Sequence, residues 1–387
     1  MSRLRTKKSA DRPAVTLFLC LVLTAISATA AAPAARIESQ IASGIQHSIF
    51  LRNDGIIWIW GQNKDGQLGD KTEASKASPW AIVALERWAQ VAAGANYTAA
   101  LKRDGSLWTW GDNSSGQLGD GSRGKQNKPI LIGVDFTWRK LSPGGASTMA
   151  LKSDGSLWGW GNNGWGQLGD GTKLDRLRPC QIGLEKDWVD VKTSSESTLA
   201  LKSNGTLWSW GGNFYGQLGD ETTQTRLAPA RVGLNTNWVS IAAGGAHSLA
   251  LRRDGTIWGW GNNEFGQVGD GGLDNRLQPR RINLETNWVS IAVGENHSLA
   301  IKRDGSLWAW GANSASQLGL GTTEKQRTPA RVGADADWKS VAGGDAHSVA
   351  LKKGGSVWAW GRNRDGQTGG DIGGVKRVPT RVVFKDE

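Results

Sequence analysis

The chain has 387 residues, a formal net charge of +11, and far more glycine (54) and tryptophan (22) than is usual. Such a length can bury a large core, and this composition favours turns and strands over helices. Its basic residues are spread along the sequence, which argues against a clustered nucleic-acid-binding surface. Cys180 is the single cysteine after the N-terminal segment, so an internal disulfide and a cysteine-based metal site are excluded.

Residues 1–35 have the order of a secretory signal peptide. Basic residues from Arg3 to Arg12 precede an apolar run over 14–26, and Ala28-Thr29-Ala30 or Ala30-Ala31-Ala32 offers a small-residue cleavage motif. The apolar run is short for a membrane span, so we expect cleavage near residues 30–32 and a secreted or periplasmic, extracytoplasmic protein. The alternative is an uncleaved membrane anchor.

The rest of the chain repeats itself every 50 residues, seven times and without insertions. A fixed period of this size indicates a repeat architecture in which neighbouring units stack on one another. Positions shared by all copies are expected to serve the fold, and varying positions are where function can be sought. The copies are 38–87, 88–137, 138–187, 188–237, 238–287, 288–337 and 338–387.

Each copy contains about four short strands and no helical period. In the fifth copy, strands are expected over 240–244, 247–252 and 256–261, with Asp254-Gly255 as a two-residue hairpin turn. A glycine-punctuated loop then leads to a strand that starts at Pro279. Four-stranded units repeated radially predict an all-β, seven-bladed β-propeller.

Two features bear on how the predicted ring is edged and closed. A proline recurs in register in every copy, and a proline at the first residue of a strand suits an edge strand. We also expect the last segment, residues 379–383, to join the sheet built by residues 40–60 and so latch the ring shut.

Tryptophans explain how the blades stack. Trp108 and Trp110 share one face of a strand, whereas Leu107 and Thr109 share the other. Because the residue between the tryptophans is mostly small, one face of a blade is bulky and the other shallow, and neighbouring blades can interdigitate at close-packed density. A further tryptophan begins every copy except the first, where Glu38 stands. Packing thus accounts for twenty of the 22 tryptophans.

The repeat resembles the RCC1 (regulator of chromosome condensation) family. Its motif is Gly-x-Leu-Trp-x-Trp-Gly-x-Asn-x-x-Gly-Gln-Leu-Gly-Asp, then Pro-x-Arg-Val, then Ile-Ala-x-Gly-x-x-His-Ser-Leu-Ala-Leu. The sixth copy departs from it at Ser316 and Leu320, and the seventh at Thr368 and Gly370. The resemblance covers residues 38–387 and implies a seven-bladed propeller, in agreement with the count of copies.

The resemblance alone does not fix the function. The family's namesake is a nuclear guanine-nucleotide exchange factor with a β-wedge insertion, for which the unbroken 50-residue spacing leaves no room. Plant relatives sense ultraviolet light, but their Gly-Trp-Arg-His-Thr element is absent here. Secreted bacterial proteins of similar repeat type bind and inhibit β-lactamases through aromatic residues on one ring face. These relatives fit best with a signal peptide.

The residue before glycine in Asn-x-x-Gly varies among the copies. Three consecutive copies place an aromatic there, and Phe214 adds a fourth. The fold tolerates Asp, Ser and Ala at this position, so packing does not require an aromatic. We therefore expect an exposed aromatic arc that serves as a binding site, since such residues dominate interaction hot spots; the alternative is local packing on the blade edges. The arc consists of Trp165, Phe214, Tyr215 and Phe265.

All four histidines occupy one repeat position in copies that are consecutive around a ring. They are secondary candidates for a ligand site; the alternative, which the family pattern favours, is that each bonds the backbone beside its own turn. These residues are His47, His247, His297 and His347.

Two more sets of charged residues recur. The first consists of carboxylates, which we expect to bond their own loops, because like groups in like settings do not make an acid–base pair. The second is a set of cations that could form a rim for an acidic partner; the alternative is that they are solvated or bonded within their loops. The carboxylates are Asp70, Asp120, Asp170, Asp220 and Asp270, and the cations are Lys76, Arg176, Arg226, Arg276 and Lys376.

These patterns indicate a secreted, non-enzymatic binding scaffold without catalytic residues, metal or cofactor. The first expectation is an unidentified protein partner, engaged by one ring face in an inhibitor-like manner. Carbohydrate binding is the alternative, because sugars also stack on aromatic rings. An exchange factor like the family's namesake, or an enzyme that uses the histidine arc, comes third. No nucleic acid is expected, and no membrane contact apart from the N-terminal segment.

Overall fold

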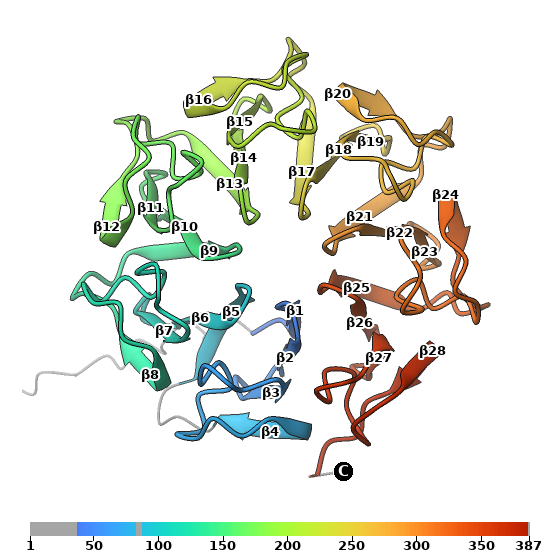
Figure 1. Cartoon of the computed structure of the whole chain (residues 1–387), viewed down its shortest axis with the longest axis horizontal. Coiled ribbons are helices and arrows are strands. Elements are labelled where there is room, and N and C mark those ends of the chain that lie inside the picture. Colours follow the sequence, from blue (N-terminus) through green and yellow to red (C-terminus); the bar gives the residue numbers. More distant parts are fainter. Residues whose placement is uncertain (1–36, 83–86, 386–387) are drawn as a thin grey trace, which may run out of the picture. The chain divides into compact units, whose positions relative to one another are not determined.

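The computed structural model describes residues 37–82 and 87–385, and the predicted signal peptide lies outside the described residues. Residues 37–387 form one compact unit. Its described part contains seven four-stranded antiparallel sheets arranged around a central opening (Figure 1). The prediction of an all-β, seven-bladed propeller is confirmed.

Each blade is built from one uninterrupted stretch of chain, with its strands ordered from the centre to the rim. The innermost strands are β1 (Gln40–Ser43), β5 (Trp88–Ala93), β9 (Trp138–Pro143), β13 (Trp188–Thr193), β17 (Trp238–Ala243), β21 (Trp288–Val293) and β25 (Trp338–Gly343). The second strands are β2 (His47–Leu51), β6 (Tyr97–Lys102), β10 (Ser147–Lys152), β14 (Ser197–Lys202), β18 (His247–Arg252), β22 (His297–Lys302) and β26 (His347–Lys352). The third strands are β3 (Ile57–Gly61), β7 (Leu107–Gly111), β11 (Leu157–Gly161), β15 (Leu207–Gly211), β19 (Ile257–Gly261), β23 (Leu307–Gly311) and β27 (Val357–Arg362). The outermost strands are β4 (Lys76–Ile82), β8 (Gln126–Leu131), β12 (Arg176–Gln181), β16 (Arg226–Arg231), β20 (Arg276–Arg281), β24 (Gln326–Arg331) and β28 (Val375–Arg381).

The recurring proline does lie on the outermost strand, but it is not the first residue of that strand. In β12 it is the fourth residue, Pro179, and the ladder slips around it: Gly159 faces Cys180, whereas Gly161 faces Arg176. The slip places the proline in a bulge, where its missing N–H removes no ladder bond.

The hydrophobic core is divided among the joints between blades. At one joint, Ile57 and Ile59 of the first blade pack against Trp88 and Trp110 of the second. Trp88 also meets Trp108 edge-on, with ring centroids 6.1 Å apart at 87°. A shallow aliphatic face therefore receives a bulky tryptophan face, as the alternation along the strands predicts.

The expected strand latch between the chain ends is wrong. β28 pairs with β27 of its own blade, and β1 to β4 already form a complete sheet. Because each repeat supplies all four strands of a blade, the first blade has no vacant strand position to fill.

Side chains close the ring instead. Phe384 lies 5.3 Å from the Trp58 ring at 76° and 6.2 Å from the Trp60 ring at 85°. Trp88 contacts its own tryptophan pair at the corresponding place in the second blade, edge-on to Trp108 and tilted at 53° to Trp110. Glu38 leaves that place without an aromatic in the first blade, and Phe384 fills it.

The alternation of strand direction gives the ring two distinct faces. One carries the connections from the first to the second strand and from the third to the fourth strand; we call it the loop face. The other carries the turns between the second and third strands and the linkers between blades; we call it the linker face. Within the described residues, no helix has the length and apolarity that a bilayer crossing requires.

A candidate binding site on the loop face

The loops between third and fourth strands hold the variable position in a fixed frame. In the third blade, the Trp165 amide donates to Oε1 of Gln167 at 2.9 Å, and the Leu168 amide donates to Oδ1 of Asn163 at 3.0 Å. Asn163 also donates to Asp170 at 3.0 Å. The amides of Ser115 and Ala315 are held by their own glutamines in the same way. The backbone there is therefore set by shared residues, whatever side chain it displays.

The aromatic arc projects from this frame. Trp165 is 39% exposed, Tyr215 41% and Phe214 49%, whereas Phe265 is half-buried. Trp165 and Phe214 meet across the joint of the third and fourth blades, with ring centroids 4.8 Å apart at 86°. The structure thus brings two of the four candidates into contact; Tyr215 follows Phe214 in the same loop, and Phe265 lies in the equivalent loop of the next blade. Edge-to-face pairs of this kind hold aromatic rings in a defined orientation.

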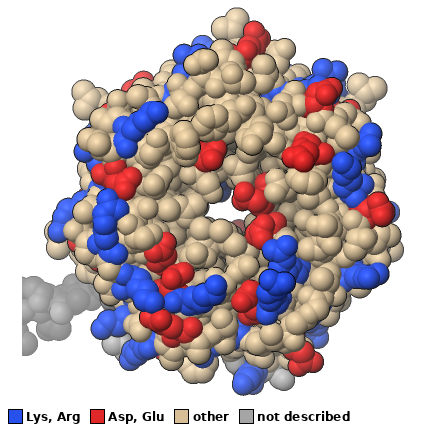
Figure 2. Space-filling view, in the orientation of Figure 1, with Lys and Arg blue, Asp and Glu red and all other residues tan. Residues whose placement is uncertain are grey.

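Carboxylates stand beside the arc, nearer the centre. The Glu196 main-chain oxygen accepts a 2.8 Å bond from Gly212, two residues before Phe214. Burial raises the pKa of Glu196, and desolvation together with the charges of Asp345 and Glu196 raises the pKa of Glu295. Glu295 and Asp345 line the mouth of the central opening, where Figure 2 shows acidic side chains on the side of β21 and β25. Asp345 is paired with Arg362 at 2.8 Å, which offsets part of the negative charge here, whereas Glu196 and Glu295 form no ion pair within the described residues.

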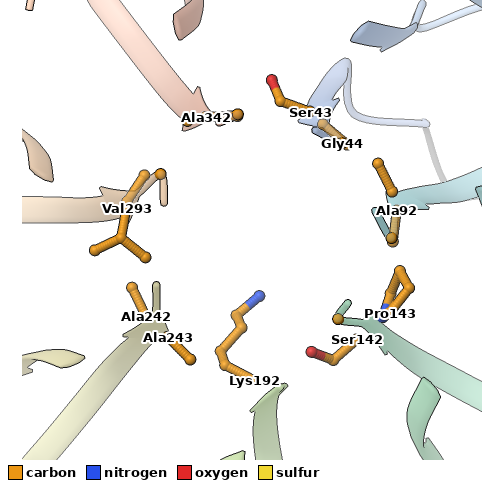
Figure 3. Close-up of a pocket in the computed structure, with 18 of the residues that line it drawn as sticks. Ser43, Gly44, Ala92, Ser142, Pro143, Lys192, Ala242, Ala243, Val293 and Ala342 are labelled. Atoms are coloured by element: carbon orange, nitrogen blue, oxygen red, sulfur yellow. The ribbon is translucent and has the colours of Figure 1, made fainter. Parts of the chain in front are cut away.

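The central opening itself is a channel of about 630 Å³, lined by the innermost strands and their loops. Lys192 of β13 points into it (Figure 3). The equivalent position is Ser142 in the third blade and alanine in the other five. The channel therefore has small, mostly neutral walls at this level, apart from one ammonium group.

The four histidines lie between blades and are at most 1% exposed. His297 Nε2 is 2.9 Å from the Ser348 hydroxyl of the next blade, and Ser348 donates to the Gln317 main-chain oxygen at 2.8 Å. Because that hydroxyl gives its proton to Gln317, the imidazole donates from Nε2. Burial lowers the pKa of His297 to about 4 and the pKa of His247 to about 3.

These histidines therefore bond a neighbouring blade rather than their own turns. Tyr97 occupies the same position in the second blade, and its hydroxyl lies 2.8 Å from that of Thr148 in the next blade. Their burial leaves the rings without access to a ligand in solution. No group of three or more His, Cys, Asp or Glu side chains in residues 37–82 and 87–385 is arranged to hold a metal ion.

The recurring cations are bonded within their own loops. Lys76 pairs with Asp70 at 2.8 Å, and Arg226 pairs with Asp220 at 2.8 Å. In the last blade, where Gly370 replaces the aspartate, Lys376 donates to the main-chain oxygen of Thr368 at 3.1 Å. The pairing neutralises most of the rim that the sequence offered for an acidic partner.

Comparison with known proteins agrees with this architecture. A family model described as the RCC1-like domain matches residues 24–287. The chain belongs to the RCC1-like family. Models of the regulator of chromosome condensation (RCC1) repeat match residues 304–351 and, in a second version, 288–317 and 338–367. No curated protein matches the chain.

Several solved structures resemble this RCC1-like propeller. Prp20p from Saccharomyces cerevisiae, described with its binding to Gsp1p and histones, is 26% identical with a TM-score of 0.73, over 80% of this chain and 81% of that one. Human WBSCR16 is 25% identical with a TM-score of 0.74, over 82% and 87%. Yeast RCC1 (Prp20) bound to Kap60 is 24% identical with a TM-score of 0.77, over 99% and 91%, and shows the fold alone.

Proposed function

We propose that this RCC1-like propeller is an extracytoplasmic, non-enzymatic scaffold that binds a protein through the aromatic arc on its loop face. The observation that carries the proposal is the exposure of Trp165, Phe214 and Tyr215 on a rigid loop frame that accepts Asp, Ser or Ala elsewhere in the ring. Exposed aromatic side chains that packing does not require are typical of interaction sites.

The aromatic side chains are held in place before any partner binds, and this preorganisation favours a role in protein binding. The glutamine braces and the Trp165–Phe214 contact fix the rings before binding, so little side-chain freedom is lost when a partner arrives. The neighbouring Glu196 and Glu295 would select a partner whose facing surface is neutral or basic. The resembling yeast Prp20p is described as binding proteins, which supports the same use of the fold here.

Location outside the cytoplasm is supported by the signal-peptide pattern of residues 1–35. It is tested by expressing the full chain and determining the N-terminus and mass of the product in the envelope and culture fractions. A product that begins near residues 31–33 in those fractions supports the proposal. A full-length product confined to the cytoplasm contradicts it.

The binding test uses residues 36–387 as bait for envelope and culture fractions, with captured proteins identified by mass spectrometry. The test variant carries Trp165→Ala, Tyr215→Ala and Phe265→Ala. The matched control carries Asp65→Ala, Ser115→Ala and Asp365→Ala, which occupy the equivalent positions in three other blades.

A protein captured by the wild type and the control, and lost by the aromatic variant, supports the proposed interface. Equal capture by all three places the interface elsewhere. The same three proteins are applied to a glycan array, because carbohydrate binding is the alternative use of exposed rings. Glycan binding that the aromatic variant loses, without protein capture, assigns the arc to sugars instead.

A further inference from the structure

The linker face carries a second arc of exposed apolar side chains, made of aliphatic rather than aromatic residues. Val134 is 88% exposed, Leu184 89%, Leu234 87% and Leu284 86%. They occupy equivalent positions in four consecutive linkers between blades. The next linker has Ala334 at this position, so the fold does not need a large side chain there. Nearly complete exposure of leucine has no folding benefit.

The local backbone holds these side chains outward. Gly183 and Gly233 precede Leu184 and Leu234 with φ of +65° and +59°; nothing lies within 4 Å of an added Cβ at Gly233, and at Gly183 the nearest atom is Oε2 of the flexible Glu185 side chain, at 3.8 Å. The linker therefore turns in open space and places its leucine at the tip.

The arrangement of the tips is flat. Equivalent positions of a ring lie in one plane perpendicular to its axis, so the four side chains project to the same level. Val189, Val239 and Val289, which are 40–48% exposed, follow the first residue of the innermost strands on the same face. A planar array of separate aliphatic tips suits a planar surface into which each can insert independently.

The linker face exposes positive charge, which is complementary to an anionic surface. Linker carboxylates are paired with lysines beneath them: Glu185 with Lys202 at 2.9 Å, and Glu285 with Lys302 at 2.7 Å. By contrast, Arg253 and Arg303 are exposed in the turns between second and third strands and have no ion pair among the described residues. The adjacent turn aspartates bond their own turns, as Asp254 does through Thr256.

The first described residue of the propeller also lies on this face. Ile37 is buried beside the turn at Gly55, where an added Cβ would lie 2.9 Å from its Cδ1. Residues 1–35, which precede it in the sequence, have the pattern of a signal peptide. The leucine tips and Ile37, the first described residue, therefore share a face.

We propose that the linker face docks peripherally on an anionic lipid bilayer. Val134, Leu184, Leu234 and Leu284 insert into the headgroup and upper acyl region, and the arginines of the neighbouring turns contact lipid phosphates. The loop face, with its aromatic arc, then points away from the membrane. This inference concerns a different surface from the proposed protein-binding site and does not depend on it.

The test measures flotation of residues 36–387 with vesicles of phosphatidylcholine containing about one-third phosphatidylglycerol. All seven hydrophobic clusters lie within this segment, so it contains the complete folding unit. The test variant carries Leu184→Ser, Leu234→Ser and Leu284→Ser. The control is Leu174→Ser, which changes a leucine that is 66% exposed on the loop face.

We expect the wild type and the control to float with the anionic vesicles, and the triple variant to bind at least about tenfold more weakly. Binding should fall in pure phosphatidylcholine and at high salt, because the arginines act through charge. Because the replaced leucines are almost fully exposed, circular dichroism should show an unchanged fold.

Absence of wild-type binding, or equal binding of the triple variant, overturns the proposal. So does an equal loss of binding in the Leu174 control. A further outcome is that the wild type fails to bind vesicles while the leucine variant no longer captures a protein that the wild type captures. In that case the face is a protein interface and the bilayer assignment is wrong.

Discussion

Nε2 of His347 in the last blade lies 3.0 Å from Oγ of Ser48 in the first, and Ser48 donates to the main-chain oxygen of Gln367 at 2.7 Å. Three other joints repeat this arrangement with a histidine, and all seven have the hydroxyl-to-glutamine bond. The seam between the chain ends is thus bonded like an internal joint. The histidines belong to the structure of the ring.

Acid should weaken the fold before the aspartates titrate. Burial lowers the pKa of His47 and His297 to about 4, and the pKa of His247 and His347 to about 3. The unfolded chain takes up these protons from about pH 6.5 downward and the native chain does not. Their contribution to stability is therefore complete above about pH 6.5 and is lost as pH falls towards 4. Each histidine can remove up to about 1.4 kcal/mol per pH unit.

Urea unfolding at pH 7.5, 6 and 5 checks this dependence. The matched variant is His297→Tyr, because Tyr97 shows that the position accepts a tyrosine; its stability should fall less steeply. Glu196 and Glu295 have raised pKa and act in the opposite sense, so Glu295→Gln should steepen the fall. A stability that does not change between pH 7.5 and 5 contradicts the assignment.

Phe384→Ala should destabilise the ring by about 3–5 kcal/mol, the usual cost of truncating a buried phenylalanine. Its side chain is 5% exposed and contacts Phe50, Trp58 and Trp60. The neighbouring Val383 is 68% exposed, so Val383→Ala should change the free energy of unfolding by less than about 0.5 kcal/mol. Denaturant unfolding of both variants measures the difference, and equal effects would refute closure by Phe384.

Gly169→Ala should cost more than Gly171→Ala, although both glycines have φ near +80°. An added Cβ at Gly169 would lie 2.6 Å from Nε1 of Trp210, whereas nothing lies within 4 Å of one at Gly171. Both changes carry backbone strain of about 1 kcal/mol, and only the first also displaces a buried tryptophan. Thermal unfolding of the two proteins separates the steric cost from the strain, and identical melting temperatures would argue against a tight joint.

Gln167→Ala should weaken partner binding although it replaces none of the aromatic residues that face the partner. Its Oε1 holds the Trp165 amide, and loss of that bond frees the loop that displays the indole. The matched change Gln117→Ala removes the same brace under Ser115. Both should lose about 1 kcal/mol of stability, but only Gln167→Ala should lower affinity for the captured protein. Equal affinities would show that the brace does not orient the site.

The number and type of blades follow from the sequence because the repeat length, the hairpin signal and the tryptophan alternation are all local. Closure does not, because a repeating sequence leaves open where a blade begins. The decisive detail was a mismatch between distant positions: Glu38 lacks the aromatic found in other copies, and Phe384 lies near the other end of the chain. Only the folded ring shows that one compensates for the other.

Part of the candidate site could also be predicted from the sequence. Variation at the position of Trp165 marks the display site, but its contact with Phe214 of the next blade depends on the distance between blades. The aliphatic arc was missed, although its signal was present: Leu184 and Leu234 each follow a glycine within a loop where no core residue is needed. Their near-complete exposure is a property of the fold alone.

Because every blade is one continuous segment, six joints are spanned by a linker and the seam between Phe384 and the first blade has no covalent connection. The ring is therefore closed at one seam by non-covalent contacts alone. A force that pulls the two chain ends apart acts first on this seam. Once the seam has opened, the blades can unfold one after another, starting from either end of the chain. A covalent bond between the chain ends would give the seam a linker like those of the other six joints. It would thereby remove the place at which unfolding under force begins.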